Sequence, residues 1–150
     1  MARQSKNLPK FKTPSANQVR DVFEEALRDA ELFDEPMYEL SDKNLKNLNL
    51  ALEILSTSFF GKEKYKTLEE KAAALFYFTI KDHIFPNGNK RTAVILTLLF
   101  LKTNGYWLNF TKDELYDLAI KVASKAARNH DKNINSIRDI LAQHIETLNE

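Results

Sequence analysis

The sequence predicts an all-α fold, a helical bundle around one buried central helix with a short β-hairpin flap. Two observations support this prediction. Apolar residues recur at three- and four-residue steps along most of the chain, and only 3 Gly and 4 Pro interrupt its 150 residues. Residues 93–101 are apolar on nearly the whole helical circumference, which is typical of a helix that is buried on all sides.

Length and composition predict a single domain over residues 1–150. The chain is 43% hydrophobic and 29% charged, and its 150 residues are too few for two domains of ordinary size. Five Lys and Arg residues precede the first acidic residue, Asp21. We therefore predict that residues 1–14 form a flexible, solvated tail, with contact to an acidic partner as the alternative.

Composition also excludes several classes of protein. A net charge of +1 argues against a broad electrostatic grip on nucleic acid, so a DNA-binding repressor is a remote alternative. The absence of cysteine excludes disulfides and thiolate chemistry and fits a reducing cytoplasm. Residues 93–101 are too short to cross a membrane, which takes about 20 apolar residues. We predict a cytoplasmic protein that contacts neither membrane nor nucleic acid.

Helix boundaries follow from apolar spacing and from capping residues. Ser41 is placed to cap one helix, and Thr67 with Glu70 forms a capping box for the next. An Asn104-Gly105 pair stops the central helix. The predicted helices span residues 14–33, 41–55, 68–82, 90–104, 111–122 and about 135–148.

Residues 56–66, STSFFGKEKYK, break this helical pattern. Their Thr, Phe and Tyr side chains favour extended backbone, and Gly61-Lys62 marks a turn. We predict a short hairpin or flap at this point, with an ordinary connecting loop as the alternative.

Lys90 and Arg91 follow a Pro-Asn-Gly-Asn turn and occupy the first turn of the central helix. The free N–H groups of that turn already carry roughly half a positive charge, so two cations there are unfavourable unless an anion binds. Gly88 allows close approach of a ligand, and Asn87 or Asn89 could cap some of the amides. The pattern predicts a phosphate site; a solvated first turn is the alternative.

His83 lies five residues before Gly88, at the end of the preceding helix. An imidazole beside a phosphate site is suited to accept a hydroxyl proton. His83, His130 and His144 do not have metal-ligand spacing with one another. Tyr106-Trp107 could stack on a base, but packing of the returning chain is the favoured explanation.

The stretch HIFPNGNKRTA, residues 83–93, resembles the signature of the Fic/Doc superfamily, His-x-Phe-x-(Asp/Glu)-(Gly/Ala)-Asn-(Gly/Lys)-Arg. All specified positions match except Asn87. The Asn-Lys-Arg-Thr ending is similar to the death-on-curing (Doc) toxin branch. The helical layout and the flap extend the likeness over roughly residues 40–125, which implies a Fic-like helical bundle.

The resemblance also implies roles for individual residues. His83 would be the general base for a hydroxyl of a target protein, and Phe85 would anchor the loop in the core. Asn87 stands where the family has Asp or Glu to help hold magnesium. The implied phosphate cradle consists of Gly88, Asn89, Lys90 and Arg91. The flap residues that would align the target by strand addition are Ser58, Phe59, Phe60, Gly61 and Lys62.

Three departures from the family pattern bear on the reaction. Members that transfer AMP usually have Gly in place of Lys90 and a second Arg in place of Val94. A lysine resembles the Doc branch, which transfers the terminal phosphate, so kinase chemistry is favoured over AMP transfer. The amide of Asn87 can coordinate a cation but lacks the charge of a carboxylate, and Asp82 is a candidate to compensate for it.

The resemblance thus implies a toxin that uses ATP and Mg²⁺ to phosphorylate a Ser or Thr of a bacterial protein, with a translation elongation factor as the first candidate. Two alternatives remain, AMP transfer and a catalytically weak nucleotide-binding or protein-interaction module. The chain lacks the Ser/Thr-x-x-x-Glu-Gly/Asn pattern of self-inhibited members. We therefore expect a small antitoxin in trans, bound in a groove beside His83 and the flap. The apolar face of residues 19–27 or Phe59 and Phe60 could supply that groove, although core packing explains the helix face equally well.

Overall fold

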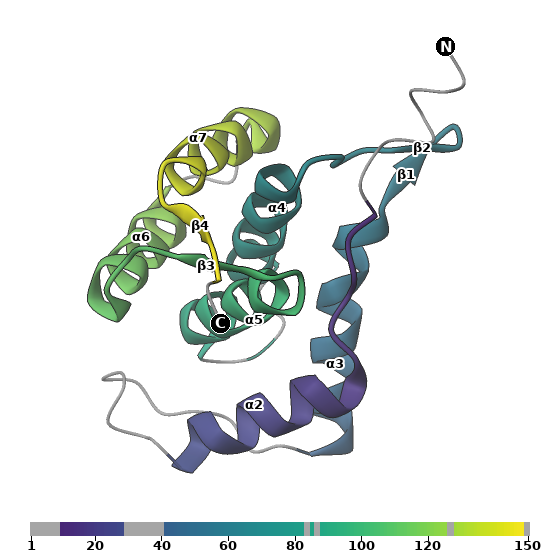
Figure 1. The fold of residues 1–150 in the computed structure, drawn as a ribbon, viewed down its shortest axis with the longest axis vertical. Helices are drawn as coiled ribbons and strands as arrows, with labels where there is room; N and C mark the ends of the chain where they lie inside the picture. Colours follow the sequence, from purple (N-terminus) through teal and green to yellow (C-terminus); the bar gives the residue numbers. More distant parts are fainter. Residues whose placement is uncertain (1–9, 29–40, 83–84, 86–87, 126–127, 149–150) are drawn as a thin grey trace.

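The computed structural model describes residues 10–28, 41–82, 85, 88–125 and 128–148. It is mostly helical, as predicted, and within these ranges it has two separate two-stranded antiparallel sheets (Figure 1). The elements are α2 Ala16–Arg28, α3 Asp42–Ala51, a 3₁₀ helix η2 Leu52–Ser56, β1 Ser58–Phe59, β2 Lys62–Glu63, α4 Leu68–Lys81, α5 Asn89–Thr103, β3 Tyr106–Leu108, α6 Lys112–Ser124, α7 His130–Ala142 and β4 Ile145–Thr147.

Helix α5 is the buried centre of the bundle, as its apolar circumference predicts. It packs against α4, α6, β3 and α2. Polar Thr92 and Thr97 are buried together with its apolar residues. The buried apolar side chains of α5 are Ala93, Val94, Leu96, Leu99, Phe100 and Leu101.

Helix α4 brings the chain to the start of the motif. Its predicted capping box is confirmed: Thr67 Oγ1 accepts from the N–H of Glu70 at 3.1 Å, and the Glu70 carboxylate accepts from the N–H of Thr67 at 3.2 Å. The helix packs on α5 and α7. Asp82 is its C-terminal cap, so His83 follows α4 directly in the chain.

Helix α3 begins where the sequence predicts it. Ser41 Oγ accepts from the N–H of Asn44 at 3.1 Å, and Leu48 and Leu52 of the predicted apolar face are buried. The last turn before Ser56 tightens into the 3₁₀ helix η2. Such tightening is common at helix ends.

The predicted hairpin is confirmed as β1 and β2, which pair with Ser58 opposite Glu63. The turn lies one residue earlier than expected, at Phe60-Gly61, where φ is +52° and +79°. Positive φ at both central residues is the geometry of a primed turn, which matches the twist of the two strands. The hairpin extends away from the helices at the upper right of Figure 1.

The C-terminal part of the helix prediction is wrong. The helix expected over residues 135–148 is α7, which begins at His130 and ends at Ala142. Ile145–Thr147 instead form β4, antiparallel to β3, with Trp107 opposite Glu146. Each strand has three residues, too few for a recognisable alternating pattern in the sequence.

The tail prediction does not hold for residues 10–14. The backbone of Lys12 forms two bonds with the Asn104 side chain, its N–H donating to Oδ1 at 2.7 Å and its carbonyl accepting from Nδ2 at 2.9 Å. Phe11 packs against the core and Pro14 is buried. Residues 1–9, and residues 29–33 of the predicted first helix, lie outside the described residues.

Part of the apolar face on which the first-helix groove was predicted is buried in the core. Val19 and Phe23 are 0% exposed and belong to the core. Core packing therefore explains their apolar spacing, and this part of the α2 face is not available to a partner.

Candidate functional site

The motif lies between the end of α4 and the first turn of α5. His83, Ile84, Pro86 and Asn87 lie outside the described residues, so the structure does not test the expected roles of His83 and Asn87. Phe85 is only 2% exposed and belongs to the core cluster. Its position is the one that an apolar loop anchor requires.

Asn89 has a role that the sequence did not reveal. Its Oδ1 accepts from the N–H of Phe85 at 3.1 Å, and its Nδ2 donates to the carbonyl of Phe85 at 2.7 Å. The side-chain amide thus pairs with both polar groups of one backbone residue and closes the loop. The suggestion that Asn89 caps the helix amides is therefore wrong, because its amide is used within the loop.

We expect Asn89→Asp to destabilise the protein by about 1–3 kcal/mol. The aspartate keeps the acceptor for the N–H of Phe85 but loses the donor, and it brings a carboxylate close to a carbonyl oxygen. Urea unfolding monitored by circular dichroism measures the change. Asn135→Asp, on the exposed surface of α7, is the matched control and should change the free energy of unfolding by less than about 0.5 kcal/mol. Equal effects of the two substitutions would contradict the loop-closing role.

The N-terminus of α5 has no side-chain cap. Gly88 is the N-cap residue, with φ of +76°, and no side-chain hydrogen bond is made at this position. Both Thr92 N–H and Thr92 Oγ1 donate to the carbonyl of Gly88, at 2.9 and 2.7 Å. The left-handed backbone explains why glycine is needed here. The first-turn amides have no acceptor within the helix itself, as a phosphate cradle requires.

The two cations of the first turn lie in different environments. Arg91 is 2% exposed, which excludes the alternative that it is a solvated surface charge. Lys90 is partly buried. Both charges add to the positive end of the α5 dipole, and this arrangement favours an anion at the N-terminus of the helix.

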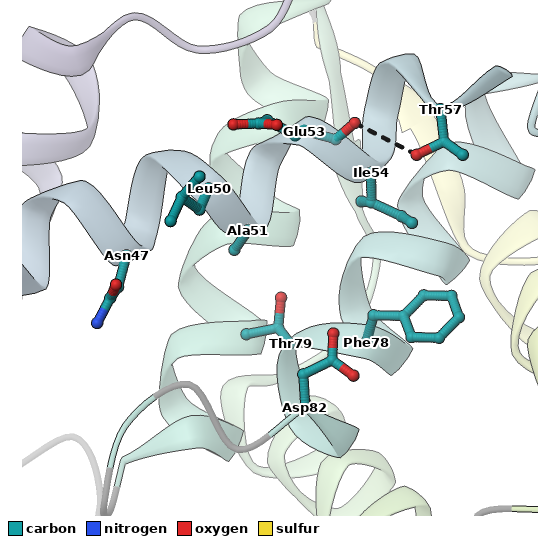
Figure 2. A pocket seen from close by; sticks show the side chains of 9 residues that line it. All are labelled: Asn47, Leu50, Ala51, Glu53, Ile54, Thr57, Phe78, Thr79 and Asp82. Carbon is teal, nitrogen blue, oxygen red and sulfur yellow. Dashed lines mark hydrogen bonds between the residues drawn. The ribbon is translucent and has the colours of Figure 1, made fainter.

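A cavity of about 290 Å³ lies beside the C-terminal end of α4 (Figure 2). Thr79 is 2% exposed, and its Oγ1 makes no hydrogen bond. Figure 2 shows Thr79 and Asp82 projecting from α4 toward α3 and η2. One weak signal for this cavity is visible in the sequence, a threonine on the inward face of α4. Its lining residues are Asn47, Leu50, Ala51, Glu53, Ile54, Thr57, Phe78, Thr79 and Asp82.

The flap, residues 58–63, is joined to α4 by a buried lysine. Lys71 is 4% exposed, and its Nζ donates to the carbonyl of Leu55 at 2.5 Å and to the Glu63 carboxylate at 3.2 Å. The ammonium thus connects η2, β2 and α4. Sequence reasoning missed this residue because a lysine on a helix is usually solvated.

The flap residues predicted to meet a target are largely exposed. Ser58, Gly61 and Lys62 are exposed, and Phe60 is fully so, at 104%. The side chain of Phe59 lies outside the described residues.

Tyr65 lies next to the flap in the sequence. Burial and, to a smaller extent, the Asp131 carboxylate raise the pKa of Tyr65 above its ordinary value. This phenol is therefore neutral at physiological pH and unsuited to act as a base.

The other two histidines have structural contacts. His130 Nδ1 lies 2.6 Å from the hydroxyl of Tyr77, and the His144 ring stacks on Phe110 with 4.0 Å between centroids. The described part of the chain contains no group of three or more His, Cys, Asp or Glu residues that could hold a metal ion. Tyr106 and Trp107 pair with β4, and Tyr106 packs against the core, as the packing explanation predicts for Tyr106.

None of the described helices is both long enough and apolar enough to cross a membrane.

Comparison with known proteins gives the family. The model of the Fic/DOC family matches residues 11–101. Toxin Doc of Mycolicibacterium smegmatis is 33% identical over 106 residues, which cover 69% of this chain and 78% of that protein. Protein kinase doc of Escherichia phage P1 is 35% identical over 79 residues, which cover 53% of this chain and 58% of that protein. No solved structure gives a significant match. The family match extends over more than half of the sequence and includes the motif, the flap and most of the central helix: the chain belongs to the Fic/Doc family, in its Doc branch.

Proposed function

We propose that this protein is a Doc-like toxin that transfers the terminal phosphate of ATP to a Ser or Thr hydroxyl of a bacterial protein. The names of the two relatives, a toxin and a protein kinase, support the proposal. The observation that carries it is the first turn of α5, where Lys90 and the buried Arg91 follow Gly88. Gly88 has a left-handed backbone conformation, and no side chain caps the helix at this position. Lysine at position 90 is the residue that the resemblance associates with phosphate rather than AMP transfer.

In this proposal the residues of the motif have different roles in the reaction. His83 takes the proton of the attacking hydroxyl, which makes the oxygen a better nucleophile toward the terminal phosphorus. The first-turn amides, Lys90 and Arg91 hold the phosphate oxygens and stabilise the negative charge that develops on them. Asn89 keeps the loop in place through Phe85.

The described residues fit the phosphate part of ATP better than they fit its metal ion. Phosphate needs N–H donors and cations, which the start of α5 offers. Mg²⁺ prefers oxygen ligands and, when bound, would neutralise charge on the phosphates. Asn87 and the exposed Asp82 at the end of α4 are the residues that we propose to hold it, and a site with so few carboxylates would bind Mg²⁺ weakly.

Partners are proposed on the same basis. The substrate would be a bacterial protein, and a translation elongation factor is the first candidate to test. A small antitoxin in trans would restrain the toxin. Because Val19 and Phe23 on the α2 face belong to the core, we propose that the antitoxin binds to the surface around the flap, where Phe60 is exposed.

Labelled ATP distinguishes the candidate reactions. The protein is incubated with a bacterial lysate, Mg²⁺ and ATP labelled at either the α or the γ phosphate. We expect γ label on a protein of the lysate and no α label. Label from the α phosphate would show AMP transfer instead of kinase activity. No label from either phosphate would favour the alternative of a catalytically weak module, which Asn87 allows.

A further inference from the structure

Phe60 is the most exposed apolar side chain in the described part of the chain. It is 104% exposed, whereas the next is Leu50, at 50%. It stands at the tip of the flap, in the turn between β1 and β2. The ring therefore contributes nothing to the core of this chain.

The backbone at Phe60 is also unfavourable for its side chain. Its φ of +52° lies in the left-handed region, which a bulky aromatic residue adopts only with strain. The first central position of a primed turn favours Asn, Asp or Gly, and Gly61 already occupies the second. Neither its burial nor its backbone conformation explains a phenylalanine here, and strain of this kind is typical of functional sites.

The flap holds this ring on a fixed base. Lys71 joins Leu55 and Glu63 to α4, and the N–H of Lys64 donates to the carbonyl of Thr57 at 2.9 Å. A flap held in this way at its base loses little backbone freedom when it binds a partner. Exposed aromatic residues on rigid supports are the usual anchors of protein interfaces.

The charge around the tip indicates what it binds. Lys62 lies in β2 and Lys66 in the segment between β2 and α4, and both are exposed. The nearby Glu63 carboxylate is engaged by Lys71. The flap and the segment that follows it therefore present exposed lysines, whose complement is acidic.

We infer that Phe60 is the anchor by which the flap recognises its protein substrate, inserting into an apolar pocket that is rimmed by acidic side chains. This inference rests on the proposed function and deepens it. Strand addition along β1 or β2 would align any extended segment, because its hydrogen bonds involve only backbone. The aromatic tip adds selection for a substrate with a pocket at a fixed distance from the modified hydroxyl.

Three variants at the tip test the inference with γ-labelled ATP and lysate. Phe60→Asn supplies a residue that suits the left-handed turn, so we expect a higher urea midpoint than in the wild type. Transfer of label to the lysate protein should fall roughly tenfold to a hundredfold. ATP affinity should be unchanged, because the tip is not part of the phosphate site. Phe60→Trp should retain transfer within about threefold, and Phe60→Gly should lose it as Phe60→Asn does.

Matched controls separate the anchor from general surface effects. Ile120 is an exposed apolar residue on α6, at 44%, and Ile120→Gln should leave transfer unchanged. Lys62→Glu and Lys66→Glu should slow transfer, whereas the same change at Lys43, an exposed residue of α3, should not.

Transfer at the wild-type rate by Phe60→Asn would overturn the inference and leave the proposed function intact. A concentration-dependent dimer of the wild type that Phe60→Asn abolishes would overturn it too, since the occupant would then be a second copy. No label with the wild type would overturn both proposals.

Discussion

His83→Ala is expected to slow phosphate transfer to the target by about 10²–10⁴-fold, the usual contribution of a general base. The measurement is the initial rate of γ-label transfer, together with growth of cells that express each variant. ATP affinity and the urea midpoint should stay at their wild-type values, because the imidazole acts on the hydroxyl rather than on the phosphates. Growth inhibition by the wild type should disappear in the variant.

His144→Ala is the matched control for this substitution. His144 stacks on Phe110, away from the motif in the sequence, so its loss should leave the transfer rate unchanged. Transfer by His83→Ala at the wild-type rate would remove His83 from the reaction. A wild-type protein that is harmless when expressed alone at a high level would contradict the proposal that this protein is a toxin.

Phe85→Ala is expected to destabilise the protein by about 3–5 kcal/mol, the range for removal of a large buried aromatic side chain. Phe85 is 2% exposed, and its backbone is held at both polar groups by Asn89. Loss of the ring leaves a cavity under the motif loop, so ATP affinity should fall as well. Urea unfolding and ATP titration measure the two effects.

Phe85→Leu refills most of that cavity and should cost less than about 1.5 kcal/mol. The pair of variants therefore separates burial of an apolar group from a specific need for the aromatic ring. A loss below about 1 kcal/mol in Phe85→Ala would show that the loop is not anchored by this side chain.

The helices could be predicted because their signals are local. Ser41, Thr67 and Thr111 each accept from the N–H three residues later, and such caps are visible in any short window of sequence. The central position of α5 also follows from its own apolar circumference. The motif could be recognised for the same reason, since its residues are contiguous.

The elements that were missed depend on distant partners. Lys12 meets Asn104, β4 meets β3, and Lys71 meets Leu55. A lysine is assigned to solvent by its type, and only the fold shows that Lys71 is buried and bonded to the carbonyl of Leu55 and the carboxylate of Glu63. Asn89 lies between these two cases. Its partner Phe85 is near in the sequence, but an asparagine at this position could either cap the helix or hold the loop, so the sequence does not decide its role.

The turn at Asn104-Gly105 fastens two segments from opposite parts of the sequence. The Asn104 side chain holds the backbone of Lys12, and the carbonyl of Gly105 accepts from the N–H of Leu148 at 2.9 Å. During synthesis the second of these contacts can form only after Leu148 has left the ribosome. Closing such long loops has a high entropic cost and tends to occur late in folding. The far end of α5, opposite the phosphate site, is therefore completed only when nearly the whole described chain has been made.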